Sequence, residues 1–371
     1  MTFERAVELI DDTPTVVIDW EGVERNVERM ARLANARMGN LRPHMKTHKM
    51  NALAELQMRN GAVGLTVAKL GEAEVMINSG VRDLLVGYPI VGQSHVRRLF
   101  DLAAQAELTV AVDSWDVADP IAREARRRSM VMAIVVEIDT GLHRCGVGPG
   151  TPAVELAQRI VDTKGLEFRG LMTHEGHAYA CSTIEELRDA TIAAGMAMKN
   201  TADELTRKGI PPKVVSMGSA GTARFGIGLE GVNEFRPGTY VFNDRTQVAL
   251  GACGIEDCAV VVIATVISRS QPGEAVIDAG SKVLSSDRKL TSGSNATYGE
   301  VANDSECQVI RISEEHAILS GGMAGALSVG DRVAIIPSHV CPVINLSDRV
   351  SIVGIGDGIV DQIVDARGMS R

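Results

Sequence analysis

One lysine of this chain is placed where it could act as a nucleophile. Lys46 lies in RPHMKTHK (42–49), between two histidines and within a strand-like run. Burial beside other cations favours the neutral form of a lysine amine, and a neutral amine forms a Schiff base with an aldehyde. A surface lysine at a strand end is the alternative that the residue type alone leaves open.

Two further segments could hold an anionic group. Arg144 lies in EIDTGLHRCGVG, where its planar guanidinium could bind a phenolate or carboxylate, or could pair with Asp139 to close the loop. The run SMGSAGT (216–222) follows a strand and precedes a possible helix turn. Its small residues let backbone N–H groups and hydroxyls approach a phosphate. It is not a P-loop, because no Gly-Lys-Ser/Thr follows.

A histidine and a cysteine could share one metal ion. His339 and Cys341 lie two residues apart in PSHVCP (337–342), between β-type runs. On an extended strand both side chains would point to one face, and imidazole with thiolate suits zinc and other divalent ions. Two ligands are too few for a structural zinc site, so the pattern indicates a catalytic site or ordinary packing. His174 and His177 of HEGH could likewise be acid–base groups or part of a rim.

The elements that must position these residues alternate between apolar runs and amphipathic stretches from Val16 to Pro237. This alternation predicts βαβ units and a parallel sheet, and about eight units favour an α/β fold with a (β/α)8 TIM-type barrel over an open doubly wound sheet. Chemistry in a barrel lies at the carboxyl ends of its strands. The strand-like runs are 41–48, 64–68, 83–87, 108–113, 131–139, 168–176, 214–219 and 234–238.

The sequence pattern changes after Phe242. Short β-branched runs, separated by turns such as QPGE and SVGD, predict an all-β domain. We therefore expect a barrel over residues 1–242 and a C-terminal β domain over 243–371 that carries the His–Cys pair. The stretch Thr13 to Trp20 could either open the barrel or lend a strand to the β domain.

Composition excludes several classes of protein. The 371 residues are 45% hydrophobic and 23% charged, which suits a large folded core. A net charge of −9 without a basic block, and 3% aromatic residues, argue against nucleic acid. The run Cys258 to Ile267 is half of the roughly 20 residues that cross a bilayer. The N-terminus lacks a signal-peptide h-region, and six cysteines without a CxxC pair fit a reducing compartment. We expect a cytoplasmic protein with no membrane partner.

Eight motifs occur in order along the chain. They are RPHMKTHK, GLTVAKLGEAE, EIDTGLHRCGV, THEGHAY, SMGSAGT, RPGTYVFND, IDAGSKVLSSD and PSHVCPVINLSD. Together they resemble one family, that of D-threonine aldolase and D-serine dehydratase, the fold-type III pyridoxal 5'-phosphate (PLP) enzymes related to alanine racemase. The resemblance spans roughly Asp12 to Val364, and it implies a PLP-binding barrel, a C-terminal β domain and a homodimer with shared active sites.

The resemblance also implies roles for single residues. Lys46 matches the lysine that forms the internal aldimine, and Arg144 matches the arginine near the phenolic oxygen of PLP. His339 and Cys341 match the pair that binds manganese, zinc or magnesium. The phosphate-binding positions match Gly218, Ser219, Gly221, Thr222, Gly238 and Thr239. His174, His177 and Tyr179 match a segment beside substrate and cofactor, and Arg236 aligns with the position that meets the pyridine nitrogen in the racemases.

Two departures from the family pattern stand out. The phosphate loop reads GSAGT where GSTPT is usual, which retains small residues but changes the shape of the loop. Some aldolases have an aspartate where this chain has Cys341; the dehydratases and other aldolases have cysteine.

The function that these parts imply is a PLP- and metal-dependent lyase of β-hydroxy-D-amino acids. We expect D-threonine aldolase activity, in which a histidine takes the β-hydroxyl proton and glycine and acetaldehyde are released. The alternative is dehydration of D-serine or D-threo-3-hydroxyaspartate to a 2-oxo acid and ammonia. A racemase would have no use for the metal pair, and a non-catalytic PLP carrier would not need the β domain. A PLP-independent metal hydrolase is the remaining alternative.

Overall fold

The computed structural model describes residues 3–269, 271–288, 296–356 and 358–371. The chain divides into two compact units. We call residues 29–46, 51–238 and 369–371 the barrel unit, and residues 1–28, 47–50 and 239–368 the β unit. The sequence-based division at 242/243 differs from these bounds, because the first 28 residues group with the C-terminal part of the chain.

Eight parallel strands form the sheet of the barrel unit, in the order β2-β9-β8-β7-β6-β5-β4-β3. A parallel bridge between His44 and Thr66 joins the two ends of this order, so the sheet closes and the predicted (β/α)8 barrel is confirmed. The strands are β2 (Asn40–Leu41), β3 (Leu65–Val67), β4 (Asp83–Val86), β5 (Glu107–Val112), β6 (Met132–Ile138), β7 (Leu166–Thr173), β8 (Val214–Met217) and β9 (Glu234–Phe235).

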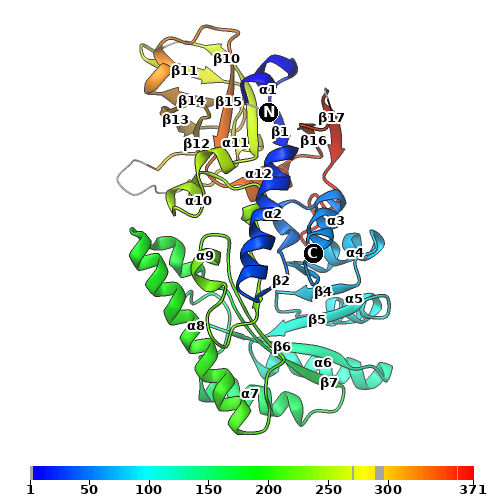
Figure 1. Cartoon of the computed structure of the whole chain (residues 1–371). Helices are drawn as coiled ribbons and strands as arrows, with labels where there is room; N and C mark the ends of the chain where they lie inside the picture. Colours follow the sequence, from blue (N-terminus) through cyan, green and yellow to red (C-terminus); the bar gives the residue numbers. More distant parts are fainter. Residues whose placement is uncertain (1–2, 270, 289–295, 357) are drawn as a thin grey trace. The chain divides into compact units, whose positions relative to one another are not determined.

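Helices cover the outside of these strands (Figure 1). In α5, for example, Val96, Leu99 and Phe100 are buried at the spacing of one helix face, while the opposite face is charged. Inside the barrel, Leu85 and Met172 belong to an apolar cluster of residues from neighbouring strands. The helices are α2 (Trp20–Ala36), α3 (Asn51–Arg59), α4 (Leu70–Asn78), α5 (Gln93–Ala103), α6 (Trp115–Arg128), α7 (Thr151–Val161), α8 (Ile184–Arg207) and α9 (Ala223–Gly226).

The β unit contains a nine-stranded sheet in the order β11-β14-β13-β12-β15-β10-β1-β16-β17. Strand β1 pairs antiparallel with β10 and parallel with β16, so the stretch Thr13 to Trp20 belongs to this sheet and not to the barrel. The strands are β1 (Thr15–Asp19), β10 (Val260–Ser268), β11 (Glu274–Ile277), β12 (Gly299–Val301), β13 (Asp304–Ile312), β14 (Ala317–Ser320), β15 (Arg332–Pro337), β16 (Arg349–Val353) and β17 (Val360–Ile363).

Short helices complete the β unit. They are α1 (Phe3–Leu9), α10 (Arg245–Ala249), α11 (Ser281–Leu284) and α12 (Val340–Leu346). Among the described residues of the whole chain, no helix combines the length and apolar character that a bilayer span requires.

Candidate active site

Lys46 lies just beyond strand β2, in the 3-10 helix η1 (Met45–Thr47). Backbone pairing with the neighbouring strands continues to His44, whose N–H donates to the Pro237 carbonyl at 3.0 Å, so the predicted strand over 41–48 is wrong only from Met45 on, where the 3-10 helix begins. The backbone N–H of Lys46 donates to Nδ1 of His44 at 3.4 Å. The lysine stands at the carboxyl end of its strand, as expected for a barrel active site.

Two arginines, a lysine and a second histidine lie near His174, which follows β7. Burial lowers the pKa of His174, and the charges of Lys46, Arg144, Arg236 and His177 lower it further, to about 3. The imidazole is therefore neutral at physiological pH. The structure thus brings five of the predicted residues together, in surroundings that suit an anionic ligand.

His177 presents an atom without a partner in this cluster. It lies in the 3-10 helix η2 (Gly176–Ala180), and its Nδ1 is buried with no hydrogen-bond partner in the described part of the chain. Gly141, which has a φ of +133°, leaves room for the ring, since a Cβ there would lie 3.3 Å from it. An unpaired buried nitrogen costs free energy, so it indicates a polar group that a ligand would supply.

The predicted phosphate loop follows β8 and leads into α9. Gly218 has a φ of +113°, a conformation that favours glycine. Ser219 and Thr222 contact each other, with the Ser219 N–H donating to Thr222 Oγ1 at 3.1 Å. Both side chains are buried. The loop has the small residues and hydroxyls that a phosphate site needs.

Two residues of the THEGHAY motif hold this loop. Glu175 is fully buried, and it accepts hydrogen bonds from the Gly218 N–H at 3.1 Å and from the Thr222 hydroxyl. The hydroxyl of Tyr179 accepts from the Gly221 N–H at 3.3 Å. The sequence indicated Tyr179 but not Glu175, whose only signal was its place between two candidate histidines.

Arg144 is half-exposed, and its guanidinium lies 3.9 Å from the carboxylate of Glu137. Burial raises the pKa of Glu137, against the opposing charges of Arg144 and Arg236. The alternative partner Asp139 instead accepts hydrogen bonds from His143, including one from the ring at 2.8 Å. Part of the Arg144 guanidinium therefore stays accessible to a ligand.

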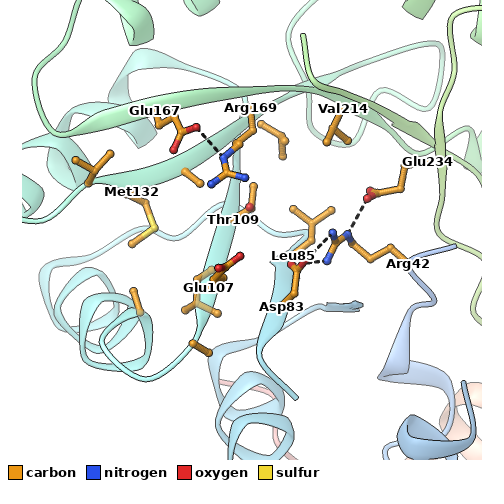
Figure 2. A pocket seen from close by; sticks show the side chains of 16 residues that line it. Arg42, Asp83, Leu85, Glu107, Thr109, Met132, Glu167, Arg169, Val214 and Glu234 are labelled. Atoms are coloured by element: carbon orange, nitrogen blue, oxygen red, sulfur yellow. Dashed lines mark hydrogen bonds and ion pairs between the residues drawn. The ribbon is translucent and has the colours of Figure 1, made fainter. Parts of the chain in front are cut away.

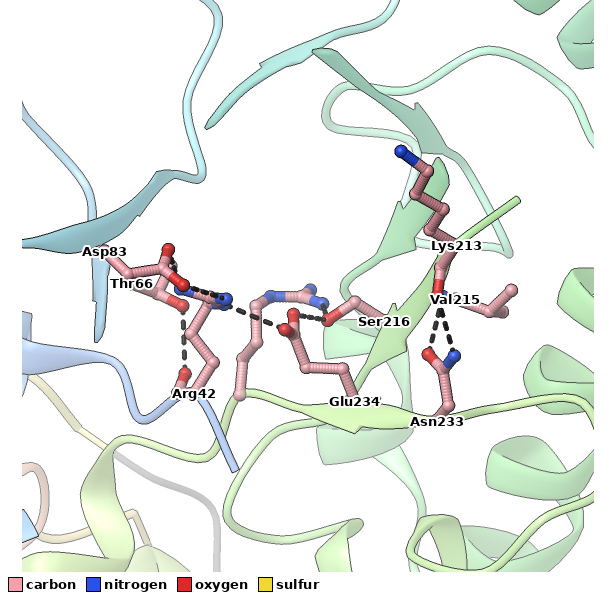
Figure 3. Close-up of polar contacts among 9 residues, drawn as sticks. Arg42, Thr66, Asp83, Lys213, Val215, Ser216, Asn233 and Glu234 are labelled. Carbon is pink, nitrogen blue, oxygen red and sulfur yellow. Dashed lines mark hydrogen bonds and ion pairs between the residues drawn. The ribbon is translucent and has the colours of Figure 1, made fainter. Parts of the chain in front are cut away.

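Arg236 is buried and bonded within the barrel. It donates to Ser216 Oγ at 2.5 Å and to the carbonyl of Thr173 at 2.5 Å. Ser216 in turn donates to Glu234 at 2.7 Å, and Glu234 also accepts from Arg42 at 2.8 Å (Figure 3). The role of Arg236 at a pyridine nitrogen stays a prediction, and the structure shows how its guanidinium is held.

A cavity of about 300 Å³ lies at the other end of the strands (Figure 2). Its lining includes Asp83, Glu107 and Met132, the first residues of β4, β5 and β6. Arg42 is ion-paired there with Asp83 at 2.7 Å and with Glu234. Because barrel chemistry occurs at the carboxyl ends, this cavity is not the candidate active site.

The candidate metal pair lies in the β unit. His339 is the residue before helix α12 and Cys341 is its second residue, so the expectation of an extended strand at this point is wrong. Burial lowers the pKa of His339. Its hydrogen bond with Cys341, the negative charges of Cys341 and Asp244, and the hydrogen bond that the ring donates to Asp287 outweigh burial and raise the pKa to about 9. Imidazole and thiol thus lie within reach of each other and fit one shared cation.

Threonines flank the thiol of this pair. Cys341 Sγ lies 3.3 Å from Thr47 Oγ1 and 3.8 Å from Thr239 Oγ1. Thr47 is the residue after Lys46 in the chain. In the described ranges, no group of three or more His, Cys, Asp and Glu side chains is placed to hold a metal ion.

Two family models match this chain. Residues 18–246 match the alanine racemase N-terminal domain, and residues 259–353 match a serine dehydratase domain. A D-threo-3-hydroxyaspartate dehydratase from Delftia sp. (strain HT23) is 34% identical over 346 residues, which are 89% of this chain and 91% of that protein.

Solved structures agree in fold. The crystal structure of a D-threonine aldolase from Filomicrobium marinum has a TM-score of 0.89 and 32% identity and covers 97% of both chains. A D-threo-3-hydroxyaspartate dehydratase in which a cysteine is replaced by alanine, described as metal-free, has a TM-score of 0.87 and 29% identity and covers 95% of this chain and 97% of that one.

Proposed function

Because this chain belongs to the alanine racemase-like family that includes D-threonine aldolases, D-serine dehydratases and 3-hydroxyaspartate lyases, we propose that it is a PLP- and divalent-metal-dependent lyase of β-hydroxy-D-amino acids. The observation that carries the proposal is the convergence of Lys46, Arg144, His177 and Arg236 on His174 at the carboxyl ends of the barrel strands. Phosphate, phenolate and carboxylate groups fit these surroundings.

Different residues of the chain would bind the cofactor and the metal ion. Lys46 would hold the cofactor, the loop from Gly218 to Thr222 its phosphate, and Arg144 its phenolic oxygen. His339 and Cys341 would hold the metal ion. When bound, PLP stabilises negative charge at the Cα of an amino acid, and a divalent ion lowers the pKa of a hydroxyl that it binds.

We assign the removal of the β-hydroxyl proton to His177. A pKa of about 3 makes His174 a weak base, whereas Nδ1 of His177 is buried without a partner. Transfer of that proton to His177 would break the Cα–Cβ bond, form the carbonyl of an aldehyde and leave the electron pair on Cα; return of one proton to Cα then gives glycine. With D-threonine the aldehyde is acetaldehyde, and D-threonine aldolase is the activity that we propose first.

Dehydration is the second candidate, and Cys341 is the observation that favours it. A metal-binding cysteine fits the dehydratase pattern, and a dehydratase relative whose cysteine is replaced by alanine is described as metal-free. In this reaction Lys46 would remove the Cα proton and the β-hydroxyl would leave as hydroxide. The products are a 2-oxo acid and ammonia. The homodimer with shared sites stays a prediction in either case.

Product analysis distinguishes the two reactions. PLP-loaded protein is given D-threonine with manganese or zinc, and then with a chelator added. Glycine and acetaldehyde, lost on chelation, are the expected products. 2-Oxobutyrate and ammonia would replace the aldolase by the dehydratase, with D-serine and 3-hydroxyaspartate tested next. Lys46→Ala should abolish either activity, and His339→Ala should remove its metal dependence. Full activity in Lys46→Ala would overturn the proposal.

A further inference from the structure

The IDAGSKVLSSD motif ends on a residue that none of the steps above uses. Asp287 lies three residues beyond α11, in the same unit as the metal pair. Its Oδ2 is 2.5 Å from Nδ1 of His339. We propose that Asp287 is a positioning residue for the metal site: its carboxylate accepts a hydrogen bond from Nδ1 and thereby directs Nε2 of His339 to the ion. This inference rests on the proposed metal-dependent function.

The distance identifies a hydrogen bond and not two ligands of one ion. Zinc binds histidine nitrogen and carboxylate oxygen at about 2.0–2.2 Å, so two such ligands on a tetrahedral ion lie roughly 3.3 Å apart. The 2.5 Å between Asp287 and His339 is shorter than that separation and fits a direct charge-assisted hydrogen bond.

Asp287 is itself held in place by a local turn. Its backbone N–H donates to Ser285 Oγ at 3.2 Å. Ser285 is buried and has a φ of +66°, so the chain reverses sharply after α11. The carboxylate therefore has a defined direction, although half of the side chain is exposed.

Groups other than Asp287 fix the backbone around His339, so the contribution of Asp287 is limited to the orientation of the imidazole ring. The carbonyl of Ser338 accepts from Thr246 Oγ1 at 2.6 Å, and the N–H of Val340 donates to Asp244 at 3.1 Å. These bonds set the position of the main chain and not the rotation or tautomer of the ring. A carboxylate on the second nitrogen sets both and raises the basicity of a metal-binding histidine.

The test measures metal affinity without turnover. Cobalt(II) is titrated against the full-length protein in competition with a chelator, for wild type, Asp287→Ala, Asp287→Asn and a control. We expect Asp287→Ala to weaken binding by about 10- to 100-fold. Asp287→Asn keeps an acceptor oxygen and should recover part of the affinity. The control is Asp348→Asn, an exposed carboxylate of the same unit that pairs with Arg367 at 3.2 Å and should bind cobalt as wild type does.

The absorption of the saturated cobalt protein separates positioning from ligation. If Asp287 positions His339, the saturated Asp287→Ala protein should show the wild-type bands, because the donor set is unchanged. Altered bands at saturation would make Asp287 a ligand and overturn the positioning role. An affinity of Asp287→Ala within twofold of wild type would also overturn it.

A second readout does not depend on metal. Nitrogen NMR of the His339 ring in metal-free protein should show an Nδ1–H that is hydrogen-bonded to a carboxylate in wild type and Asp348→Asn, and the loss of that hydrogen bond in Asp287→Ala. An unchanged Nδ1–H signal in Asp287→Ala contradicts the inference. Wild-type protein that binds no cobalt would overturn both the inference and the metal dependence. Weaker cobalt binding by Asp287→Ala in a protein without lyase products would overturn the proposed function alone.

Discussion

At the scale of single residues, His174 gives a pH dependence of stability. Its pKa is lowered from 6.5 to about 3 in the folded protein, so between these values the unfolded chain binds a proton that the folded chain does not. Neutral His174 therefore makes its full contribution to the free energy of unfolding above pH 6.5, and this contribution is lost as the pH falls towards 3. Linkage makes the loss from this residue about 2 kcal/mol between pH 7.5 and pH 5.

Substitution of His174 should remove that part of the pH dependence. Urea unfolding of PLP-free protein at pH 7.5 and pH 5 should show a smaller difference between the two pH values in His174→Gln than in wild type. His95→Gln removes an exposed histidine of the same unit and serves as the control. Equal pH dependence in wild type and His174→Gln would show that the His174 ring is not buried in its neutral form.

Residue types single out candidate ligand-binding groups more readily than the groups that hold those candidates. Lys46 stands out because it lies between two histidines in a strand-like run, and Arg144 because it lies in a glycine-rich loop after a strand. Glu175 and Asp287 give no such signal, since their roles depend on hydrogen bonds to Gly218 and His339 that only the folded chain creates. An acidic residue in a polar motif is indistinguishable from a solvated one until its partner is known.

At the scale of elements, strand β7 depends on one glycine. Gly170 lies opposite Val214 of β8, and a Cβ at this position would be 1.8 Å from the Val214 carbonyl oxygen. The β6–β7 pairing also shifts register here. Both β7 and β8 end at candidate site residues, so their spacing positions the site.

Gly170→Ala should therefore separate the two strands. Because the obstacle is backbone and not a flexible side chain, we expect a loss of roughly 3 kcal/mol or more in the free energy of unfolding. Gly80→Ala is the control, since Gly80 has a φ of +103° but no atom within 4 Å of its added Cβ. It should lose only about 1–2 kcal/mol for the left-handed conformation. Urea unfolding followed by circular dichroism compares them, and equal midpoints would contradict the close approach of β7 and β8.

Periodicity predicted the barrel strands and failed at two short segments of the site. Apolar runs such as MAIVVEI over β6 are fully buried, so tertiary contacts reinforce the local pattern. Around Lys46 and Cys341 the sequence favours extended chain, but a 3-10 helix begins at Met45 and α12 begins at Val340 instead. Pro342, in the first turn of α12, could not donate to a strand ladder. Tertiary hydrogen bonds such as that from Val340 to Asp244 decide these cases.

At the scale of the whole molecule, the chain does not separate into two consecutive domains. It passes between the barrel unit and the β unit at five points, after Glu28, Lys46, Met50, Gly238 and Gly368. The sequence shows that short β-branched runs begin near Phe242. It cannot show that β1 lies between β10 and β16, because these pairings join residues more than 200 positions apart. Sequence alone left the stretch around β1 open for this reason.

The insertion of β1 yields a prediction for the β unit. Val17 is fully buried at the centre of β1, opposite Val261 on one side and Ser351 on the other. Val17→Asp places an unpaired charge in that core, which costs several kcal/mol. We expect this variant to lose the β unit, and cobalt binding at His339 and Cys341 with it.

Val360→Asp is the matched control, because Val360 is a partly exposed residue of the edge strand β17 in the same sheet. Its free energy of unfolding should change by less than about 1 kcal/mol, and it should bind cobalt as wild type does. Circular dichroism, urea unfolding and cobalt titration test both variants. A Val17→Asp protein that kept the metal site would mean that β1 is not a central strand of the β unit.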